Sequence, residues 1–451
     1  MDNEEIEQVI EKIRELIDNK RINELHSFLE DLNSQDLPEI LDEFNEDDTI
    51  MIFRLLAKEK AAEVFVELDS DEQEKLISYL TDSEIKNVMN EIYMDDAVDL
   101  IEEMPANVVK RILANTKPGN RKIINELLKY PDSTAGSLMT TEFIDFKENY
   151  TVEYAFDIIK QKGLRKETVY NCYVLSVDRK LLGVIDIKQL LVASPEMSVK
   201  DIMSTNVISV STLEDQEEVA KVFDKYDFIA LPVVDNENRL VGIITIDDAI
   251  DVIKEETLED FEKMAAVVPN DNTYFKTSVL KHARNRIVWL VILMFSAIIT
   301  GSIIESFESA ISTLPLLVSF IPLIMGTGGN CGSQTSTLII RSMAMDELST
   351  KDWLKALWKE IRVAVLVGIT LALIQFGLIM LQYHDVKIAT VVALSLVCTV
   401  IAAKAIGCLL PIGAKKIHLD PAIMAAPLLT TVVDAVSVSM FFVFATSIIG
   451  L

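Results

Sequence analysis

Apolar positions divide the chain into two parts near residue 286. After Arg286, five long apolar stretches follow one another, and each can cross a bilayer as a helix, which takes about 20 residues. They run over Ile287–Ile304, Ile311–Ile340, Val363–Leu381, Ile388–Ile412 and Pro421–Ile449. Buried helices of a large soluble protein are the alternative, but those would keep a polar face for water that these stretches lack. The pattern predicts an all-α transmembrane domain of five helices over residues 287–451.

The first part of the chain begins with a short repeat. Between residues 52 and 104, apolar blocks recur every twelve residues: IFRLL at 52, VFVEL at 64, LISYL at 76, VMNEI at 88 and LIEEM at 100. Acids and turn residues such as TDSE separate the blocks, and such residues begin helices. Short repeated helices stack into a solenoid. We therefore expect an all-α, acidic, superhelical N-domain over residues 1–130.

A second repeat, of about 64 residues, follows between residues 138 and 253. MTTEFIDF at 139 corresponds to MSTNVISV at 203, and each copy shows the pattern of a strand, a helix, a β-hairpin and a helix. The pattern predicts two α/β copies, at 138–200 and 201–253, which resemble a tandem pair of CBS domains. That resemblance implies that Thr245 and Asp248 face the phosphate and ribose of a nucleotide. Capping of the following helix explains these two residues equally well.

An acidic helix connects the repeats to the first apolar stretch. Its acids are spaced three and four residues apart, so they crowd one helix face and repel one another unless cations neutralise them. We expect a cation-sensing face in this connecting segment, residues 254–286, and in the turns just before it; a face that only solubilises the chain is the alternative. The acids are Asp247, Asp248, Asp251, Glu255, Glu256, Glu259 and Asp260.

Charge is distributed as unevenly as hydrophobicity. The chain carries a net charge of −28, whereas residues 287–451 hold nine basic and nine acidic residues, so residues 1–286 carry all of the excess. Negative charge repels the phosphates of nucleic acids and favours cations. We expect no nucleic-acid partner. The four cysteines have no paired spacing, which fits a reducing cytosol and a membrane.

Basic residues at the ends of the apolar stretches predict the orientation of the chain. Lys281, Arg284 and Arg286 precede the first stretch, whereas the loop after it contains Glu305 and Glu308 and no Lys or Arg. Because basic loops remain in the cytosol, the pattern predicts a multi-pass protein of the cell membrane. The N-terminus would be cytosolic and the C-terminus outside.

One carboxylate lies inside an apolar stretch. Asp434 follows Pro421 by thirteen residues, or about 20 Å along a helix, which places it near the middle of the membrane. A charge there costs at least ~2.5–3.5 kcal/mol unless water, a cation or a base compensates it. We interpret Asp434 as a pore-lining carboxylate that attracts cations, and an ion pair with Lys404 is the alternative.

The second apolar stretch contains PLIMGTGGNCGSQTST at residues 322–337. Four glycines within seven positions weaken a helix, and we expect irregular backbone there whose carbonyl groups line a water-filled path. Amide and hydroxyl oxygens follow, and with carboxylates these suit hard ions such as Mg²⁺ or Ca²⁺. Close packing of helices through small residues is the alternative, and it is compatible with the first. The residues are Gly326, Gly328, Gly329, Asn330, Gly332, Gln334 and Thr335.

The order of these parts resembles the MgtE family of magnesium transporters over essentially the full length. A helical N-domain, tandem CBS domains, an acidic connecting (plug) helix and five spans with GTGGNxGxQ and the LDPA motif at 419–422 carry the resemblance. It implies a homodimer in which two Asp434 side chains surround one hydrated Mg²⁺. Gly328, Gly329 and Asn330 would lie beside that ion, and Asp420 would be part of a gate at the cytosolic mouth.

The resemblance also implies two sets of regulatory residues. Regulatory Mg²⁺ would bind near Glu63, Asp95, Asp96, Asp99, Asp215, Glu217 and Asp227. A nucleotide such as ATP, acting as a modulator, would occupy a pocket of Tyr170, Phe228, Ala230, Pro232, Thr245 and Asp248. The first CBS copy has Asp186 and Gln189 at the places of Thr245 and Asp248, so the resemblance implies one adenosine site.

Together these features predict a Mg²⁺-selective, channel-like transporter rather than an enzyme. Uptake would be passive, driven by the membrane potential, and cytosolic Mg²⁺ would close the path by binding the acidic faces. A membrane-embedded zinc hydrolase would need a ligand set that the four histidines do not form, and no GxxxxGK[ST] loop is present for ATP hydrolysis. An anion channel conflicts with Asp434. The sequence leaves open whether Co²⁺, Ni²⁺, Mn²⁺ or Ca²⁺ also passes.

Overall fold

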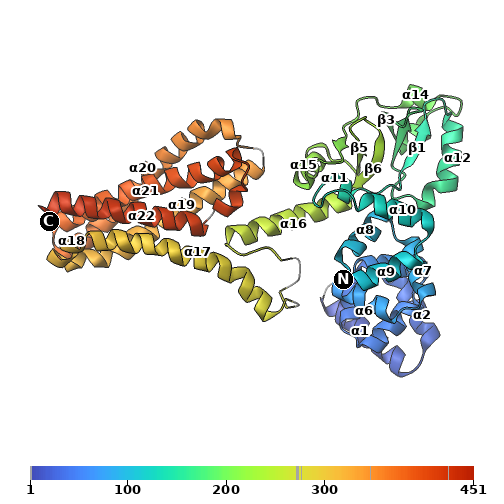
Figure 1. The fold of residues 1–451 in the computed structure, drawn as a ribbon, viewed down its shortest axis with the longest axis horizontal. Coiled ribbons are helices and arrows are strands. Elements are labelled where there is room, and N and C mark those ends of the chain that lie inside the picture. Colours follow the sequence, from blue (N-terminus) through green and yellow to red (C-terminus); the bar gives the residue numbers. More distant parts are fainter. Residues whose placement is uncertain (1–2, 271–273, 276, 346, 425, 451) are drawn as a thin grey trace. The chain divides into compact units, whose positions relative to one another are not determined.

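A computed structural model describes residues 3–270, 274–275, 277–345, 347–424 and 426–450 (Figure 1). The chain divides into two compact units, Met1–Ile253 and Lys254–Leu451. The first unit contains the helical N-terminal region and both α/β repeats, and the second contains the apolar helices. The predicted fold class, an all-α superhelix, a tandem α/β pair and an all-α membrane domain, is confirmed.

Short helices fill the first 127 residues. From α4 to α10, each helix begins twelve residues after the one before it, and the apolar repeat between residues 52 and 104 predicts this spacing for α4 to α8. At Thr81 the cap is reciprocal: the hydroxyl accepts from the backbone N–H of Glu84 (3.3 Å), and the Glu84 carboxylate accepts from the N–H of Thr81 (2.7 Å). The helices and turns are α1 (Asn3–Asp18), α2 (Ile22–Asp31), η1 (Ser34–Asp36), α3 (Leu37–Asp42), α4 (Glu46–Leu55), α5 (Lys58–Val66), α6 (Ser70–Tyr79), α7 (Asp82–Glu91), α8 (Met94–Glu103), α9 (Ala106–Asn115) and α10 (Pro118–Leu127).

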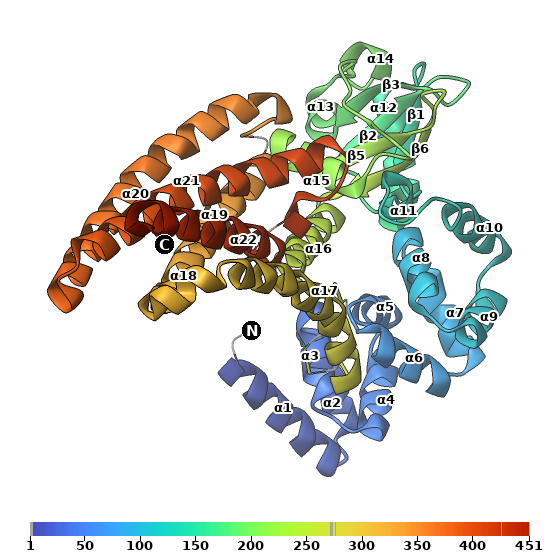
Figure 2. The same ribbon diagram turned by 60° about the vertical axis from the view of Figure 1, so that its left-hand side comes forward.

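These helices stack side by side and share one core. Leu25, Ile52, Val64 and Ile112, from different helices, are fully buried in a single apolar cluster that runs the length of the stack. Figure 2 shows the resulting superhelical path from α1 to α10. Burial of one apolar face of each helix against its neighbours is what stabilises helices this short.

Two three-stranded sheets follow, one in each repeat. In each sheet the first strand is parallel to the second, and the second is antiparallel to the third. Cys172 and Val174 pack below one sheet, whereas Tyr173 and Ala230 meet in a cluster shared by both copies. The elements are α11 (Ala135–Leu138), β1 (Ile144–Lys147), α12 (Val152–Lys162), η2 (Gly163–Arg165), β2 (Asn171–Leu175), β3 (Leu181–Asp186), α13 (Ile187–Val192), α14 (Val199–Ile202), β4 (Val210–Ser211), α15 (Gln216–Tyr226), β5 (Ala230–Val234), β6 (Leu240–Thr245) and α16 (Ile246–Met264).

The second unit contains five helices that are long and apolar enough to cross a membrane, which confirms the five predicted stretches. Several of them extend beyond those stretches; the first begins at Val279, for example. The elements are α17 (Val279–Ser306), α18 (Glu308–Thr313), η3 (Pro315–Phe320), α19 (Ile321–Ala344), η4 (Thr350–Asp352), α20 (Trp353–Tyr383), α21 (Val386–Lys416), η5 (Pro421–Met424), α22 (Ala426–Ala445) and the π-helical turn η6 (Thr446–Gly450). Helices α19, α21 and α22 pack together around buried side chains such as Leu396, Phe441 and Phe442. Apolar side chains such as Leu290 and Leu366 remain exposed on α17 and α20, as expected of faces that meet lipid or another chain.

Candidate ion-conducting and regulatory sites

Asp434 lies on α22, next to the face of that helix that packs against α19. Val433 and Ser437 on that face are buried, whereas Asp434 is partly exposed. Among the described residues no ion pair involves Asp434, and Lys404 forms its pair elsewhere. The alternative of a Lys404–Asp434 pair is therefore wrong. A partly exposed carboxylate on an apolar spanning helix fits the attraction of a cation.

The glycine-rich segment forms a continuous helix. Residues 321–344 are one α-helix, and none of the glycines at 326, 328, 329 and 332 has a positive φ, so the expected irregular backbone is wrong. The glycines instead allow close packing. A Cβ at Gly328 would lie 2.8 Å from Ser437 Oγ and 2.9 Å from Val433 Cγ1. The helix persists because its backbone hydrogen bonds stay internal, while α21 and α22 fill the space that missing side chains leave.

Two buried hydroxyl groups accompany that contact. Thr399 Oγ1 on α21 and Ser437 Oγ on α22 are buried and have no hydrogen-bond partner in the part of the chain that the structure describes. Asn330 and Gln334 of the same segment are exposed, and they lie on the side of α19 away from these buried glycines. Neutral oxygens and one carboxylate are thus the polar groups that α19 and α22 offer to an ion.

Asp420 lies at the junction of α21 and α22 and contacts the connecting helix. Its carboxylate accepts from the N–H of Ala422 (2.8 Å) and pairs with Lys263 Nζ (2.7 Å) at the end of α16. Lys263 also pairs with Glu259 (2.7 Å). Burial lowers the pKa of Lys263, but the hydrogen bonds that its ammonium donates to Asp420 and Glu259 outweigh this effect, so the pKa is raised and the ammonium stays charged. Because of this ion pair, a movement of this part of α16 would change the contacts of Asp420.

An acidic cluster occupies the first unit, where α8 meets the α/β repeats; Asp95 is buried, Asp99 is exposed, and the other members are partly buried. It contains Asp95, Asp96 and Asp99 on α8, Glu142 after α11, Glu167 before β2, and Asp248 at the start of α16. The N–H of Met94 donates to Glu142 Oε2 (3.1 Å) and ties α8 to the repeats. Asp95 Oδ1 and Glu167 Oε2 are buried without a hydrogen-bond partner among the described residues. Buried carboxylate oxygens without partners are costly, and a cation would compensate them.

The pKa values in this cluster are raised because its carboxylates are partly removed from water and repel one another. Burial, followed by the charge of Asp248, raises the pKa of Asp96 to about 7, and burial with the charge of Asp96 raises that of Asp99 to about 7. Glu167 rises to a pKa of about 8 for the same reasons. Burial raises the pKa of Asp248 to about 6, although hydrogen bonds from Thr245 oppose the change. Asp95 is raised well above its ordinary pKa by burial and then by Asp96. At neutral pH, this cluster therefore accepts either protons or a cation.

No three His, Cys, Asp or Glu side chains within the described ranges already stand in position to ligate a metal directly. Mg²⁺ usually keeps several waters and takes only one or two carboxylates from the protein. The unpartnered oxygens of Asp95 and Glu167 are compatible with an ion held in that way.

The other predicted regulatory acids are spread over several elements. Glu63 is exposed on α5. Asp215 caps the start of α15 by accepting from the N–H of Glu217 (2.9 Å), Glu217 pairs with Lys221 (2.9 Å), and Asp227 ends the same helix with φ 53°. The structure thus brings Asp95, Asp96, Asp99 and Asp248 together but separates Asp215 from Asp227 by the length of α15. The remaining acids follow one another along α16: Asp247, Asp251, Glu255, Glu256, Glu259 and Asp260.

Comparison with known proteins then decides the family. A family model described as the MgtE divalent cation transporter matches residues 321–444, one described as the MgtE intracellular N domain matches 32–133, and the CBS domain model matches 135–196 and 199–255. The magnesium transporter MgtE of Thermus thermophilus is 34% identical over 439 residues, which cover 96% of this chain and 97% of that protein. The Bacillus subtilis protein of the same name is 31% identical over 443 residues, or 98% of each chain. This chain belongs to the MgtE family.

Two solved structures agree with the MgtE assignment. One is described as the cytosolic domain of the Mg²⁺ channel MgtE in complex with ATP; it is 34% identical, has a TM-score of 0.52, and matches over 54% of this chain and 99% of its own. Another, described as the soluble part of a magnesium transporter, is 32% identical with a TM-score of 0.53 and matches over 56% of this chain and 99% of its own. Both structures cover a little over half of this chain, without the whole of its five-helix region.

In this MgtE chain, Thr245 and Asp248 form a helix cap. Thr245 donates its hydroxyl (2.7 Å) and its N–H (3.3 Å) to Asp248 Oδ2, so the capping interpretation is confirmed, and it leaves the nucleotide role a prediction. Asp186 and Gln189 form the equivalent cap in the first copy, where Gln189 Oε1 accepts from the N–H of Asp186 (2.9 Å). Of the other predicted nucleotide residues, Tyr170 is exposed, Phe228 stacks on Tyr226, and Ala230 and Pro232 lie buried in β5.

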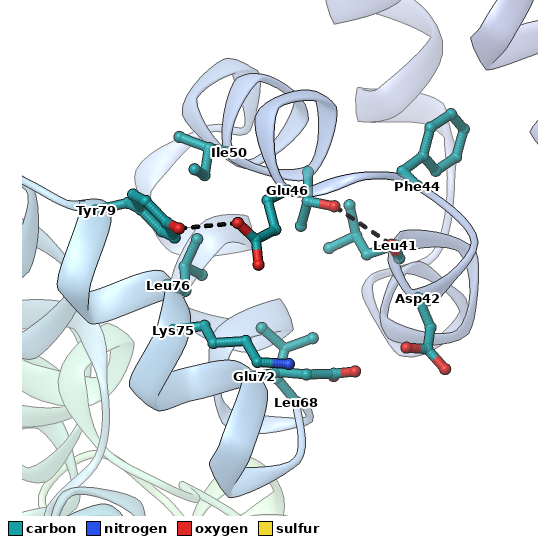
Figure 3. Close-up of a pocket in the computed structure, with 11 residues that line it drawn as sticks. Leu41, Asp42, Phe44, Glu46, Ile50, Leu68, Glu72, Lys75, Leu76 and Tyr79 are labelled. Atoms are coloured by element: carbon teal, nitrogen blue, oxygen red, sulfur yellow. Dashed lines mark hydrogen bonds between the residues drawn. The ribbon is translucent and has the colours of Figure 1, made fainter. Parts of the chain in front are cut away.

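A cavity of about 120 Å³ lies in the N-domain of this MgtE chain, between α3, α4 and α6 (Figure 3). Its lining is mainly apolar, and Tyr79 donates a hydrogen bond to Glu46 Oε2 (2.8 Å) at its rim. That bond raises the pKa of Tyr79. None of the predicted site residues lines this cavity.

Sequence patterns did not identify several residues that these sites contain. Glu142 and Glu167 stand in ordinary polar segments between elements, and Glu360 follows Lys359 near the start of α20. Lys263 is one of many charges on α16. Only tertiary structure brings these side chains to buried acids or to a buried base, so no local pattern distinguishes them.

Proposed function

We propose that this MgtE-family chain conducts Mg²⁺ passively across the cell membrane. Asp434 carries the proposal: it is a carboxylate within an apolar spanning helix, and no described residue pairs with it. Such a charge persists in a membrane where water or a cation compensates it. The relatives named magnesium transporters, similar over nearly the whole chain, favour Mg²⁺ as that cation.

A homodimer would complete the path. Mg²⁺ retains several waters and needs few protein ligands, so two Asp434 carboxylates from two chains suffice to hold one hydrated ion. Gly328, Gly329, Asn330 and Gln334 would line the path near that ion. The exposed apolar side chains of α17 and α20 are available to lipid and to the second chain.

The orientation follows from the charged ends of the helices. Lys281, Arg284 and Arg286 lie on the first turns of α17, so this end and the whole N-terminal part would be cytosolic, and the C-terminus would be outside. In this orientation a doubly charged ion entering the cell gains about 4.6 kcal/mol per 100 mV. The membrane potential is therefore sufficient to drive uptake without a coupled ion.

Cytosolic Mg²⁺ would close the path by binding the acidic surfaces. Asp95, Asp96, Asp99 and Asp248 support this, because their cluster contains unpartnered buried oxygens and raised pKa values. Further ions would bind Glu63, Asp215, Glu217, Asp227 and the acids of α16. The Lys263–Asp420 pair supports transmission from α16 to the cytosolic mouth.

A nucleotide would modulate this response rather than be hydrolysed. The relative solved in complex with ATP makes ATP the first ligand to test. It would occupy the pocket of Tyr170, Phe228, Ala230, Pro232, Thr245 and Asp248, where the exposed Tyr170 ring is available for stacking on a base.

A flux assay in liposomes tests the proposal. Purified protein should admit Mg²⁺ at a rate that rises with an inside-negative K⁺ diffusion potential, and Co²⁺, Ni²⁺, Mn²⁺ and Ca²⁺ in competition would establish selectivity. Flux that ignores the potential and requires a Na⁺ or H⁺ gradient would contradict passive conduction.

A further inference from the structure

A buried ion pair joins three of the spanning helices. Lys404 Nζ on α21 donates to Thr335 Oγ1 on α19 (3.0 Å) and lies 3.5 Å from Glu360 Oε2 on α20. The Thr335 hydroxyl in turn donates to the same Glu360 oxygen (3.0 Å). Thr335 is fully buried, and the side chains of Lys404 and Glu360 are 6% and 13% exposed.

The location of this network is unfavourable for charges. Lys404 is twelve residues from the end of α21 at Lys416, or about 18 Å inside the helix. Ionised side chains at such depth face the interior of the bundle, pair with one another and serve function. Buried pairs can often be replaced by apolar residues without loss of stability. Stability alone therefore does not account for two charges at this depth.

A close approach of two helices lies one turn from the network. A Cβ at Gly407 would be 2.5 Å from the carbonyl oxygen of Gly332. Gly332 precedes Thr335 by three residues, and Gly407 follows Lys404 by three, so the glycine contact and the polar contact lie on the same faces of α19 and α21. The glycines allow the approach, and the polar contact selects one register and one rotation of α19.

We propose that Lys404 and Glu360 are positioning residues for ion conduction. Through Thr335 they fix the rotation of α19, and thereby the placement of Asn330 and Gln334 relative to Asp434. This inference rests on the proposed conduction of Mg²⁺. Neither residue touches the ion in this proposal.

The test compares single and double variants of the full chain. K404M and E360M each leave one buried charge unpaired, so each should lower the Tm in detergent, whereas K404M/E360M should recover it. A positioning role predicts that the double variant still differs from wild type in liposomes, with Mg²⁺ flux about tenfold lower because its ligands are displaced. Its Mg²⁺:Ca²⁺ permeability ratio should also change. K404R keeps the charge and should keep wild-type flux and ratio.

K415M is the matched control. Lys415 also joins α21 to α19, through the carbonyl of Met343 (3.3 Å), but it lies at the end of the helix. Its removal should leave the flux and the permeability ratio unchanged.

The outcomes separate this proposal from the proposed function. A double variant with wild-type Tm, flux and ratio would overturn the positioning role and leave Mg²⁺ conduction intact. If the double variant does not fold, T335V decides, because it removes only the hydroxyl: a changed ratio at unchanged Tm supports positioning, and an unchanged ratio overturns it. Absence of flux from the wild-type chain would overturn the proposed function itself, and positioning with it.

Discussion

Among single side chains, Asp434 gives the most direct test of conduction. Asp434→Asn keeps the size of the side chain and removes the charge that attracts Mg²⁺. We expect Mg²⁺ flux to fall by about tenfold or more, since losing only ~1.4 kcal/mol of attraction gives that factor. Because no described residue pairs with Asp434, the Tm in detergent should not fall. Flux in liposomes and thermal unfolding measure the two effects.

Asp385→Asn is the control for that substitution. Asp385 caps α21 by accepting from the N–H groups of Lys387 (2.8 Å) and Ile388 (3.2 Å), and Asn caps helices as well as Asp does. Flux should remain at the wild-type level. Normal flux through Asp434→Asn would instead rule out Asp434 as the conducting carboxylate.

The acidic cluster predicts a specific dependence of stability on pH. The pKa values of Asp96, Asp99 and Glu167 are raised to about 7, 7 and 8. Because the folded state holds these protons more tightly than the unfolded state, the stabilisation is complete below about pH 4 and is lost as pH rises to about 8. Without Mg²⁺, the Tm of residues 1–253 should fall over this range. Millimolar Mg²⁺ should restore it at pH 8 and have little effect at pH 5.

Glu167→Gln tests whether the cluster is the cause. The substitution removes one titrating group and one buried charge, so the fall in Tm between pH 5 and pH 8 should become smaller. Na⁺ at equal ionic strength controls for general screening of the net charge. A Tm that is independent of pH without Mg²⁺ would contradict the raised pKa values.

For single residues, the sequence indicates a functional role only where the neighbours along the chain make the residue unusual. Asp434 is conspicuous because its neighbours are apolar. Glu142, Glu167 and Glu360 are not, because they lie among other polar residues, and only the fold buries them. The alternative ion pair between Lys404 and Asp434 is wrong because distance along the sequence does not tell which helices face each other, and Lys404 pairs with Glu360 instead.

Among the elements, α19 and α21 depend on glycine at one contact. Gly407→Ala places a Cβ 2.5 Å from the carbonyl oxygen of Gly332. Because this contact is with backbone, neither helix can move away at a small cost in free energy. Overpacking of this kind typically costs about 1–3 kcal/mol, so we expect a lower Tm and reduced flux. Gly413→Ala on the same helix is the matched control, because nothing lies within 4 Å of its Cβ. An equal Tm for both variants would contradict the close approach.

Elements with a local pattern were predictable from sequence. The twelve-residue spacing between residues 52 and 104 predicted the repeated short helices α4 to α8, and hydrophobicity located all five spanning helices. The glycine-rich segment was not, because its helix depends on what packs against it: the side chains of α22 and the backbone of α21 fill the space beside Gly328 and Gly332. The sequence shows the glycines that weaken this helix, but it does not show that α21 and α22 pack against them and stabilise it.

For the whole molecule, the distribution of charge leads to the gating prediction. Residues 1–286 carry the entire net charge of −28, so their acidic surfaces repel one another when Mg²⁺ is scarce. An ion that binds only the closed form, at ten times its dissociation constant, contributes about 1.4 kcal/mol per site to closure. Several weak sites therefore produce a steep response, in which the conducted ion closes its own path.

Deleting residues 1–130 tests where that response originates. The deletion removes α8 with Asp95, Asp96 and Asp99, together with Glu63, and leaves every spanning helix in place. We expect the shortened chain to conduct Mg²⁺ and to require a higher cytosolic Mg²⁺ concentration for inhibition, as measured by flux in liposomes at a series of internal concentrations. The triple variant D95N/D96N/D99N in the full chain should shift inhibition in the same direction, which excludes a general effect of truncation. If both proteins close at the wild-type Mg²⁺ concentration, the acidic cluster has no part in sensing, and its buried charges need another explanation.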